Sequence, residues 1–295
     1  MTNQDSLITI IIPTYLRQDI ALKTIKSLSF QDFEDFEVVV VDQSPKKHNK
    51  LEYFEHKKFT YKYINIDQVG LPNARNIGAE MANGKILIFI DDDCIPNNNF
   101  ISEFNNIFIK SDKEMICIGG RVIEKNSKIF KNKKTLPGGW FSWYGKTLKN
   151  LDTEQDGACE WAPGGNFAVK KQHYFMVKGF DINFIGNAML EDVDFGFRFV
   201  KFGGEVYFSH LPEIEHLREV TGGTRSESMD KGMFYRSHNT VYFLRKHKKM
   251  INLFPAFLYL NAVALNDLFR MKHSLLAFFW CWNGFFSGFK IKINQ

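Results

Sequence analysis

Short apolar runs alternate with segments of helical spacing along the first part of the chain. Runs of strand length that carry few polar side chains are typical of strands buried on both faces of a parallel sheet. The predicted elements are strands at 7–13, 36–41, 61–66 and 86–90 and helices at 21–28, 51–54 and 73–81. This alternation predicts an α/β fold, in which a mostly parallel sheet is flanked by helices on both faces.

The same alternation continues beyond residue 100, with one long interruption. The later predicted elements are a helix at 101–108, strands at 115–123 and 205–208, an ordered segment at 161–169 and a helix that begins at Glu191 and ends at Gly203. Between them, residues 124–156 are rich in lysine, asparagine, glycine and aromatic residues and predict a long loop. Long loops of this kind are either functional flaps or surface segments, so two interpretations stay open: a substrate-contacting flap, or aromatic side chains packed on the core.

Polar side chains follow four of the predicted strands, at Thr14, Asp42, Asp67 and Asp91 to Asp93. Parallel sheets bind ligands at the carboxyl ends of their strands, so these side chains are candidates for one site. Three successive carboxylates at the end of a buried strand repel one another, and a divalent cation would relieve that repulsion. The alternative is a polar turn, with Asp93 or Asn97 capping a helix that begins near Pro96.

Composition and charge limit the cellular compartments and the classes of binding partner to be considered. Of the 295 residues 44% are hydrophobic and 24% charged, as in a folded soluble protein. The formal charge of +5 suits an anionic substrate or membrane surface, and the lysines at 125–134 are explained by solubility without nucleic acid. The four cysteines lie far apart, which favours a reducing compartment. The polar N-terminus lacks the pattern of a secretory signal, so the expected location is the cytoplasm.

Motifs spread over residues 7–220 resemble those of a family-2 glycosyltransferase with the GT-A fold. In chain order they are Pro13-Thr14-Tyr15-Leu16-Arg17, Asp42, Asn73-Ala74-Arg75-Asn76, Asp91-Asp92-Asp93, Gly164-Gly165-Asn166 and Glu191-Asp192. The resemblance implies an enzyme that moves a sugar from a nucleoside-diphosphate sugar, with UDP favoured, to a hydroxyl of a sugar or lipid-linked acceptor. It also implies inversion at the anomeric carbon and a role in cell-surface polysaccharide or glycolipid synthesis.

The resemblance also assigns roles to individual residues. The implied donor site, to which the strand-end Asp67 is added, consists of Pro13, Thr14, Tyr15, Arg17, Asp42, Asp67, Arg75, Asp91, Asp92, Gly165 and Asn166. A Mn²⁺ or Mg²⁺ ion would be held by Asp93, because both metals suit carboxylate and phosphate oxygens. His216 is either a second metal ligand or a structural hydrogen-bonding residue.

An acidic segment, Glu191-Asp192-Val193-Asp194, opens the predicted helix that follows the sugar-binding motif. By resemblance Asp192 is the base that removes the proton of the acceptor hydroxyl, with Glu191 beside it in the catalytic pair. Successive residues of a helix point in different directions, so Glu191 and Asp194 stay open as alternatives to Asp192. An acidic first turn is also favoured by the helix dipole alone.

Other functions remain to be weighed against this enzyme. A catalytically silent nucleotide-sugar-binding subunit of a membrane-associated assembly would share the fold without turning the donor over. A nucleotidyltransferase would need a glycine-rich phosphate loop after the first strand, and the turn at 13–17 contains no glycine. No nucleic-acid partner is expected.

The predicted domains are a catalytic domain at 1–225, with a donor half at about 1–123 and an acceptor half at about 157–225, and a helical apolar-aromatic region at 226–295. That region starts with a basic run at 245–249 and holds two apolar runs, at 253–265 and 275–289. They are interrupted and followed by polar or charged residues, namely Asn266, Asp267, Arg270, Lys272, His273, Lys290 and Lys292. Runs this short favour peripheral contact through residues 250–292 with the inner face of the cell membrane. A spanning hairpin, packing on the catalytic domain and a homo-oligomeric contact stay open.

Overall fold

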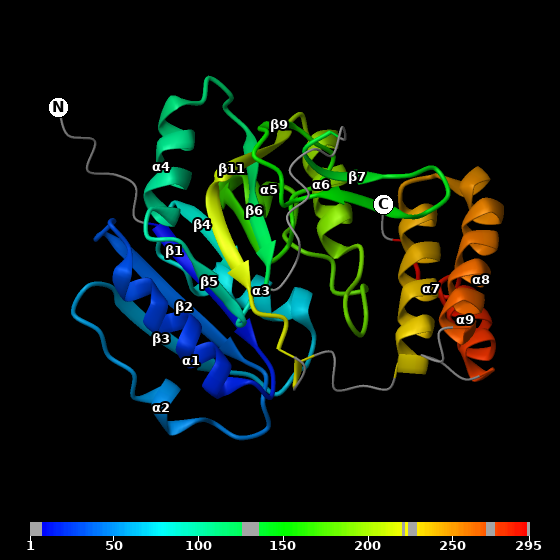
Figure 1. Ribbon diagram of the computed structural model, residues 1–295, viewed down its shortest axis with the longest axis horizontal. Coiled ribbons are helices and arrows are strands. Elements are labelled where there is room, and N and C mark those ends of the chain that lie inside the picture. Colours follow the sequence, from blue (N-terminus) through cyan, green and yellow to red (C-terminus); the bar gives the residue numbers. More distant parts are fainter. Residues whose placement is uncertain (1–7, 126–135, 220–221, 224–228, 270–274, 294–295) are drawn as a thin grey trace.

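The computed structural model describes residues 8–125, 136–219, 222–223, 229–269 and 275–293. Four predictions concern residues outside this set: Leu7 at the start of the first strand, residues 126–135 of the long loop, the domain boundary at 225, and the charged segment at 270–273. Figure 1 shows a central sheet flanked by helices, with the helices of the C-terminal region packed beside it. The α/β fold predicted from the sequence is confirmed.

The N-terminal half of the sheet is parallel, as predicted. Its strands, in the order β3-β2-β1-β4, are β1 (Ile8–Thr14), β2 (Phe36–Asp42), β3 (Thr60–Asn65) and β4 (Ile86–Ile90). The connections are α1 (Gln18–Ser27) with a 3-10 turn at Leu28–Phe30, α2 (Asn49–Glu52) and α3 (Leu71–Met81). The carboxyl ends of β1, β2 and β4 therefore meet at one edge.

The other half of the sheet contains both parallel and antiparallel pairs. Strand β10 (Asn166–Lys170) runs antiparallel between β4 and β6 (Ile116–Glu124), and β11 (Glu205–His216) runs parallel to β6. Two short strands, β5 (Cys94–Pro96) and β9 (Gly157–Ala158), pair antiparallel with β11. The predicted last strand at 205–208 was too short. It resumes after a break in register between Phe208 and Glu213 and ends at His216.

Alternating side chains of the strands build one core on each face. Ile8, Ile10 and Ile12 pack with α1 and α4 (Phe100–Lys110), whereas Ile11 and Phe89 face the other side. The second core is closed by α3, α5 (Lys171–Met176) and α6 (Glu191–Lys201). Because every side chain of β1, β2 and β4 is buried, these strands read as continuous apolar runs.

Two local predictions were wrong. The loop predicted at 124–156 contains a hairpin, β7 (Gly138–Phe141) and β8 (Thr147–Asn150), which Figure 1 shows reaching toward the C-terminal helices. The alternative in which Asp93 or Asn97 caps a helix near Pro96 fails as well. The chain forms β5 there, and α4 begins only after Asn99.

The C-terminal region is helical, as predicted. It consists of α7 (Met229–Lys246), a 3-10 turn (Met250–Asn252), α8 (Leu253–Phe269) and α9 (Leu276–Ser287). Tyr242 and Phe243 of α7 share a core cluster with Trp161 and Leu190 of the preceding part of the chain. The three helices therefore pack on one another and on the side of the sheet that carries α6 (Figure 1).

Candidate active site

A cavity of about 420 Å³ lies at the carboxyl ends of β1 and β4 and extends to the start of α6. Twelve of the residues predicted for the site line it: Pro13, Thr14, Tyr15, Arg17, Arg75, Asp91, Asp92, Asp93, Gly165, Glu191, Asp192 and His216. They come from segments that are far apart in the sequence. The register of the parallel strands brings the first of them together, since Thr14 and Asp91 follow neighbouring strands.

Asp92 points into the protein and holds the turn that follows β4. Its carboxylate accepts a hydrogen bond of 2.7 Å from the Thr14 hydroxyl and lies 3.5 Å from the Arg17 guanidinium. Burial raises the pKa of Asp92 to about 7, and the carboxylates of Asp91 and Asp93 add to the shift. This carboxylate therefore fixes the position of its two neighbours in the cavity.

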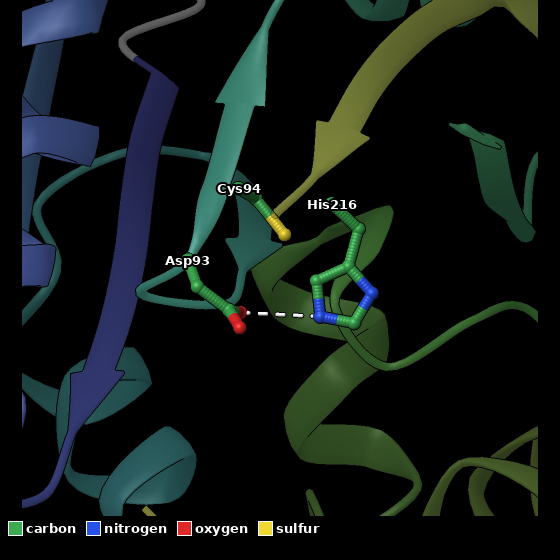
Figure 2. Close-up of side chains that lie close together, drawn as sticks. All are labelled: Asp93, Cys94 and His216. Atoms are coloured by element: carbon green, nitrogen blue, oxygen red, sulfur yellow. Dashed lines mark ion pairs between the residues drawn. The ribbon is translucent and has the colours of Figure 1, made fainter. Parts of the chain in front are cut away.

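Asp93 and His216 form the pair that is suited to a divalent metal. Figure 2 shows the Asp93 carboxylate, the His216 imidazole and the Cys94 thiol converging, with 3.2 Å between His216 Nε2 and Asp93 Oδ1. His216 reaches this position because β11 extends past residue 208 and pairs with β5, which places it opposite Cys94. A carboxylate oxygen from the turn before β5 and an imidazole nitrogen from the end of β11 are ligand types that fit Mn²⁺.

Cys94 is the third residue of this group, and its Sγ lies within 4.8 Å of the donor atoms of Asp93 and His216. Burial raises the pKa of the Cys94 thiol well above its ordinary value, and nearby carboxylates add to the shift. A neutral thiol is a poor metal ligand. The second oxygen of Asp93 lies 3.1 Å from Arg17 Nη1, so this carboxylate is held between a cation and an imidazole.

Arg75 connects two carboxylates on opposite sides of the cavity. Its guanidinium donates to Glu191 Oε1 at 2.5 Å and to Asp91 Oδ1 at 3.0 Å, and the side chain is almost fully buried. Arg75 is therefore a buried residue of the cavity and not a surface arginine. Glycine at 164 makes room for this arrangement, since a Cβ there would lie 2.9 Å from Arg75 Nη1.

Asp192 lies at the start of α6 and lines the cavity. One carboxylate oxygen accepts from the Gly164 amide at 3.3 Å and the other from the Val193 amide at 2.8 Å. Burial raises the pKa of the Asp192 carboxyl, and burial and the neighbouring Asp192 raise that of Glu191, although Arg75 opposes both shifts. A raised pKa suits a group that accepts a proton near neutral pH.

Asp194 lies outside the cavity. It is fully buried and accepts from Arg198 Nε at 2.8 Å, Lys246 Nζ at 2.7 Å and His247 Nε2 at 2.9 Å. Although burial opposes ionisation, these three partners hold the pKa of Asp194 well below its ordinary value. The sequence leaves three acidic residues open as the base. Of these, Asp194 joins α6 to α7 and does not line the cavity.

Three predicted site residues do not line the cavity. Asp42 is buried beneath it and accepts from the Tyr63 hydroxyl at 2.7 Å and the Ser44 amide at 2.8 Å. Asp67 is exposed on the segment after β3. The Asn166 amide donates to the carbonyls of Arg121 and Pro212, so this side chain ties the sheet together.

Several residues of the cavity were not predicted. Gln43 follows Asp42 at the end of β2, so its strand-end position could have identified it. Thr147 and Lys149 come from the hairpin in the predicted loop, which agrees with the flap interpretation. The remaining residues have no motif that marks them: Val69, Gly70, Leu71, Trp161, Gly186, Asn187, Met189, Leu190 and Gly223.

The comparison with protein families agrees with this geometry. The profile described as glycosyl transferase family 2 matches residues 9–173, more than half of the chain. The chain belongs to glycosyl transferase family 2. The match includes the strand-end aspartates and Arg75 and stops before Asp192. The family profile therefore covers one side of the cavity and not the side formed by the start of α6.

Curated relatives share part of the chain. An uncharacterised glycosyltransferase of Rickettsia bellii is 30% identical over 129 residues, which is 41% of this chain and 19% of the relative. The GalNAc(5)-diNAcBac-PP-undecaprenol beta-1,3-glucosyltransferase of Campylobacter jejuni is 28% identical over 161 residues, 48% of this chain and 52% of the relative. The chain therefore spans about half or less of the length of these two proteins.

A solved structure supports the fold over a longer stretch. GalNAc-T7, crystallised with UDP, GalNAc and Mn²⁺, has a TM-score of 0.65 at 19% sequence identity and covers 82% of this chain and 48% of its own. The GT-A fold predicted from the sequence is thereby confirmed.

Proposed function

We propose that this glycosyltransferase transfers a sugar from a nucleoside-diphosphate sugar to a hydroxyl acceptor with inversion at the anomeric carbon. The observation that carries the proposal is that a metal-binding pair, Asp93 and His216, and a desolvated carboxylate, Asp192, line one cavity from different elements. A donor diphosphate needs a cation, and an acceptor hydroxyl needs a base. The cavity offers both.

The charges of the cavity fit each part of the donor. A Mn²⁺ or Mg²⁺ ion bound by Asp93 and His216 would neutralise charge on the departing diphosphate. Arg17 and Arg75 each have a buried Nε without a hydrogen-bond partner in the described part of the chain, and these N–H groups would donate to phosphate or sugar oxygens of the donor. We infer a UDP-sugar as the favoured donor, in agreement with the UDP in the GalNAc-T7 structure.

Asp192 is the residue we assign to the acceptor. Its two hydrogen bonds come from backbone amides, so its position does not depend on another mobile side chain. As base it would take the proton of the acceptor hydroxyl while that oxygen forms the bond to the anomeric carbon and the bond to the diphosphate breaks. Attack from the face opposite the leaving group inverts the configuration.

The proposed acceptor is based on a relative, and the proposed location is based on that relative and on the C-terminal helices. The Campylobacter relative is named for an undecaprenol-linked substrate, and we infer a lipid-linked acceptor in polysaccharide or glycolipid synthesis at the cytoplasmic face of the membrane. By length and composition, Met250–Phe269 could cross a membrane, with a mean hydropathy of 1.2 over its best window. The partner helix α9 has only 12 residues, about 18 Å, against a hydrocarbon core of about 30 Å. Contact in the plane of the interface therefore fits this pair better than a spanning hairpin.

The test of the proposed function is a donor screen with the purified chain. UDP-, GDP- and dTDP-sugars are offered with a short-chain lipid diphosphate-linked sugar, with Mn²⁺, Mg²⁺ or EDTA, and both released nucleotide and glycosylated product are measured. We expect metal-dependent turnover of a UDP-sugar and an inverted anomeric proton signal in the fresh product. A donor that binds in calorimetry but is neither hydrolysed nor transferred would favour the silent-subunit alternative.

A further inference from the structure

The segment that leads into the catalytic pair has a backbone that needs support. Gly186, Ala188 and Leu190 all have positive φ, of 63°, 52° and 78°. Residues with a side chain rarely adopt this region, and they remain there only where surrounding contacts hold them. Gly186 and Leu190 line the cavity, and Leu190 directly precedes Glu191. The position of Asp192 therefore depends on what holds residues 181–190.

One face of α7 supplies those contacts. Tyr235, Asn239, Tyr242 and Lys246 are spaced by four, three and four residues, so they lie in one row along the helix. Asn239 accepts from the Ile185 amide at 3.2 Å and donates to the Ile185 carbonyl at 3.1 Å.

The rest of this row contacts the segment before and after Ile185, at Asp181 and at Gly186. The Tyr242 hydroxyl donates to Asp181 at 2.7 Å, and Lys246 Nζ lies 2.6 Å from the same carboxylate oxygen. The Tyr235 ring packs so closely on Gly186 that a Cβ there would lie 2.3 Å from it. Residues 181–186 are thus attached to α7 at three points.

Lys246 also reaches the helix that carries the base. Its Nζ lies 2.7 Å from Asp194 Oδ1, two residues after Asp192, and 2.6 Å from Asp181 Oδ2. His247 and Arg198 complete the partners of Asp194. One ammonium group therefore connects the beginning of the segment to the first turn of α6, and all of these groups are largely buried.

We propose that α7 is part of the active site, and that Lys246, Asn239 and Tyr242 are positioning residues which set the 181–190 segment and Asp192 for transfer. Helix α7 lies beyond the residues 9–173 that match the family profile. The proposal rests on the proposed role of Asp192, but the attachment of the segment to α7 is independent of it.

The main experiment replaces Lys246 and uses a substitution on the exposed face of α7 as the control. Lys246→Met keeps the length of the side chain and removes the charge, Lys246→Arg restores it, and Lys231→Met alters an exposed lysine of the same helix. We expect Lys246→Met to lower kcat at least about 10-fold, as misplacement of a catalytic group does. Donor affinity should change less than about twofold, because the donor contacts lie on β1, β4 and α3. Lys246→Arg should recover most of the rate, and Lys231→Met should match the wild type.

Two milder variants test the same contacts in case Lys246→Met does not fold. Asn239→Ala and Tyr242→Phe each remove contacts to the segment without leaving a buried charge unpaired, and exposed Asn283→Ala and Tyr53→Phe are their controls. Both test variants should lower kcat with donor affinity kept. Folded variants with a lowered melting temperature but wild-type kcat below it would overturn the proposal, since α7 would then only stabilise the protein.

Hydrogen–deuterium exchange separates this proposal from the proposed function. The amides of residues 183–190 should exchange faster in Lys246→Met, Asn239→Ala and Tyr242→Phe than in their controls, whether or not any sugar is transferred. Unchanged exchange would show that α7 does not hold the segment. Faster exchange in the variants, together with a wild-type chain that transfers no sugar to any acceptor, would retain the attachment and reject the proposed chemistry.

Discussion

At the scale of single residues, the cavity holds more negative than positive charge. Five carboxylates, Asp91, Asp92, Asp93, Glu191 and Asp192, share the guanidinium groups of Arg17 and Arg75. Burial is the main cause of the raised pKa values of Asp92, Glu191 and Asp192. A bound divalent cation would lower this excess and keep the carboxylates ionised.

Replacing Asp93, the carboxylate proposed to bind the metal, tests this balance of charge. Asp93→Asn keeps the shape of the side chain and removes the charge, so we expect kcat to fall about 100-fold or more in saturating Mn²⁺, since a metal contributes several kcal/mol to stabilising developing charge. The exposed Asp112→Asn is the control. The measurement is product formation, with circular dichroism to show that the fold is kept. Wild-type rates for Asp93→Asn, or full activity of the wild type in excess EDTA, would contradict the metal role.

Replacing the base should separate binding from transfer. Asp192→Asn keeps the amide contacts from Gly164 and Val193 in part and removes the proton acceptor. We expect transfer to be abolished while donor affinity stays within about threefold, because the base contacts the acceptor and not the nucleotide. Calorimetric titration of UDP beside a transfer assay measures both. If donor affinity falls in parallel with the rate, Asp192 belongs to donor binding and the assignment is wrong.

The raised pKa of Asp192 also predicts a pH dependence. The base works only when it is deprotonated, so activity is present above its pKa and is lost as the pH falls through it. Because burial raises this pKa, the acid limb of kcat should lie above the pH of about 4 at which an ordinary aspartate titrates. A pH–rate profile at saturating metal and donor measures the limb. Unchanged kcat down to pH 4 would mean that no group with a raised pKa acts as base.

At the scale of elements, helix α3 shows how closely the layers pack. Gly78 lies against β1, and a Cβ there would be 2.4 Å from Ile11 Cγ2. A small residue at this position allows the helix that carries Arg75 to approach the sheet. The buried guanidinium of Arg75 reaches both sides of the cavity from that helix.

The same substitution in two helices should have opposite effects on stability. Gly78→Ala gains about 1 kcal/mol of helix propensity but creates a clash in a packed core, which costs about 1–3 kcal/mol, so the net effect is destabilising. Gly232→Ala in α7 meets nothing within 4 Å and should stabilise the protein by up to about 1 kcal/mol. Urea unfolding of both variants measures the difference. Equal stabilisation by the two alanines would show that α3 is not in close contact with β1.

The sequence predicts those parts of the site that local pattern determines. Thr14, Asp91 and Asp93 follow uninterrupted apolar strands, so their place at one edge of the sheet could be inferred. The hairpin at 138–150 and the extension of β11 to His216 depend on pairing with distant strands, which apolar periodicity does not reveal. The contacts of Asp194 with Lys246 and His247 join residues more than fifty positions apart and carry no local signal.

At the scale of the whole molecule, α8 and α9 present apolar side chains on both of their faces. The inward row, which includes Ala256, Leu260 and Ala264, packs against α7 and α9. The outward side chains of the pair are large and exposed: Phe254, Leu258, Leu265, Phe269, Leu276, Phe279, Trp282 and Phe286. A surface helix of a soluble protein normally has polar side chains on its outward face. An outward face this apolar is typical of a site that contacts a membrane or another protein.

Basic side chains gather at one end of this surface. Arg245 donates to the carbonyls of Gly288 and Ile291, which brings the turn before α8 next to the segment after α9. Lys248 and Lys290 are both exposed, and each lies within three residues of a residue that takes part in these contacts. Each lysine or arginine near an anionic leaflet contributes about 1 kcal/mol to binding. We infer that the outward faces of α8 and α9 lie in an anionic membrane interface, with the cavity held close to its acceptor.

Flotation with vesicles tests this attachment. The full chain should float with vesicles that contain anionic phospholipid and remain at the bottom with neutral ones, and added salt should weaken binding because the basic side chains are screened. The double variant Phe254→Asp/Phe286→Asp places charges on the outward face and should stay at the bottom, whereas Phe30→Asp, at a side chain of similar exposure on the catalytic part, should float as the wild type does. If the wild type fails to float and instead sediments as a dimer that the double variant breaks, a second copy covers this surface. Equal flotation of all three proteins would place the membrane contact elsewhere on the chain, because charges on α8 and α9 would then have no effect on binding.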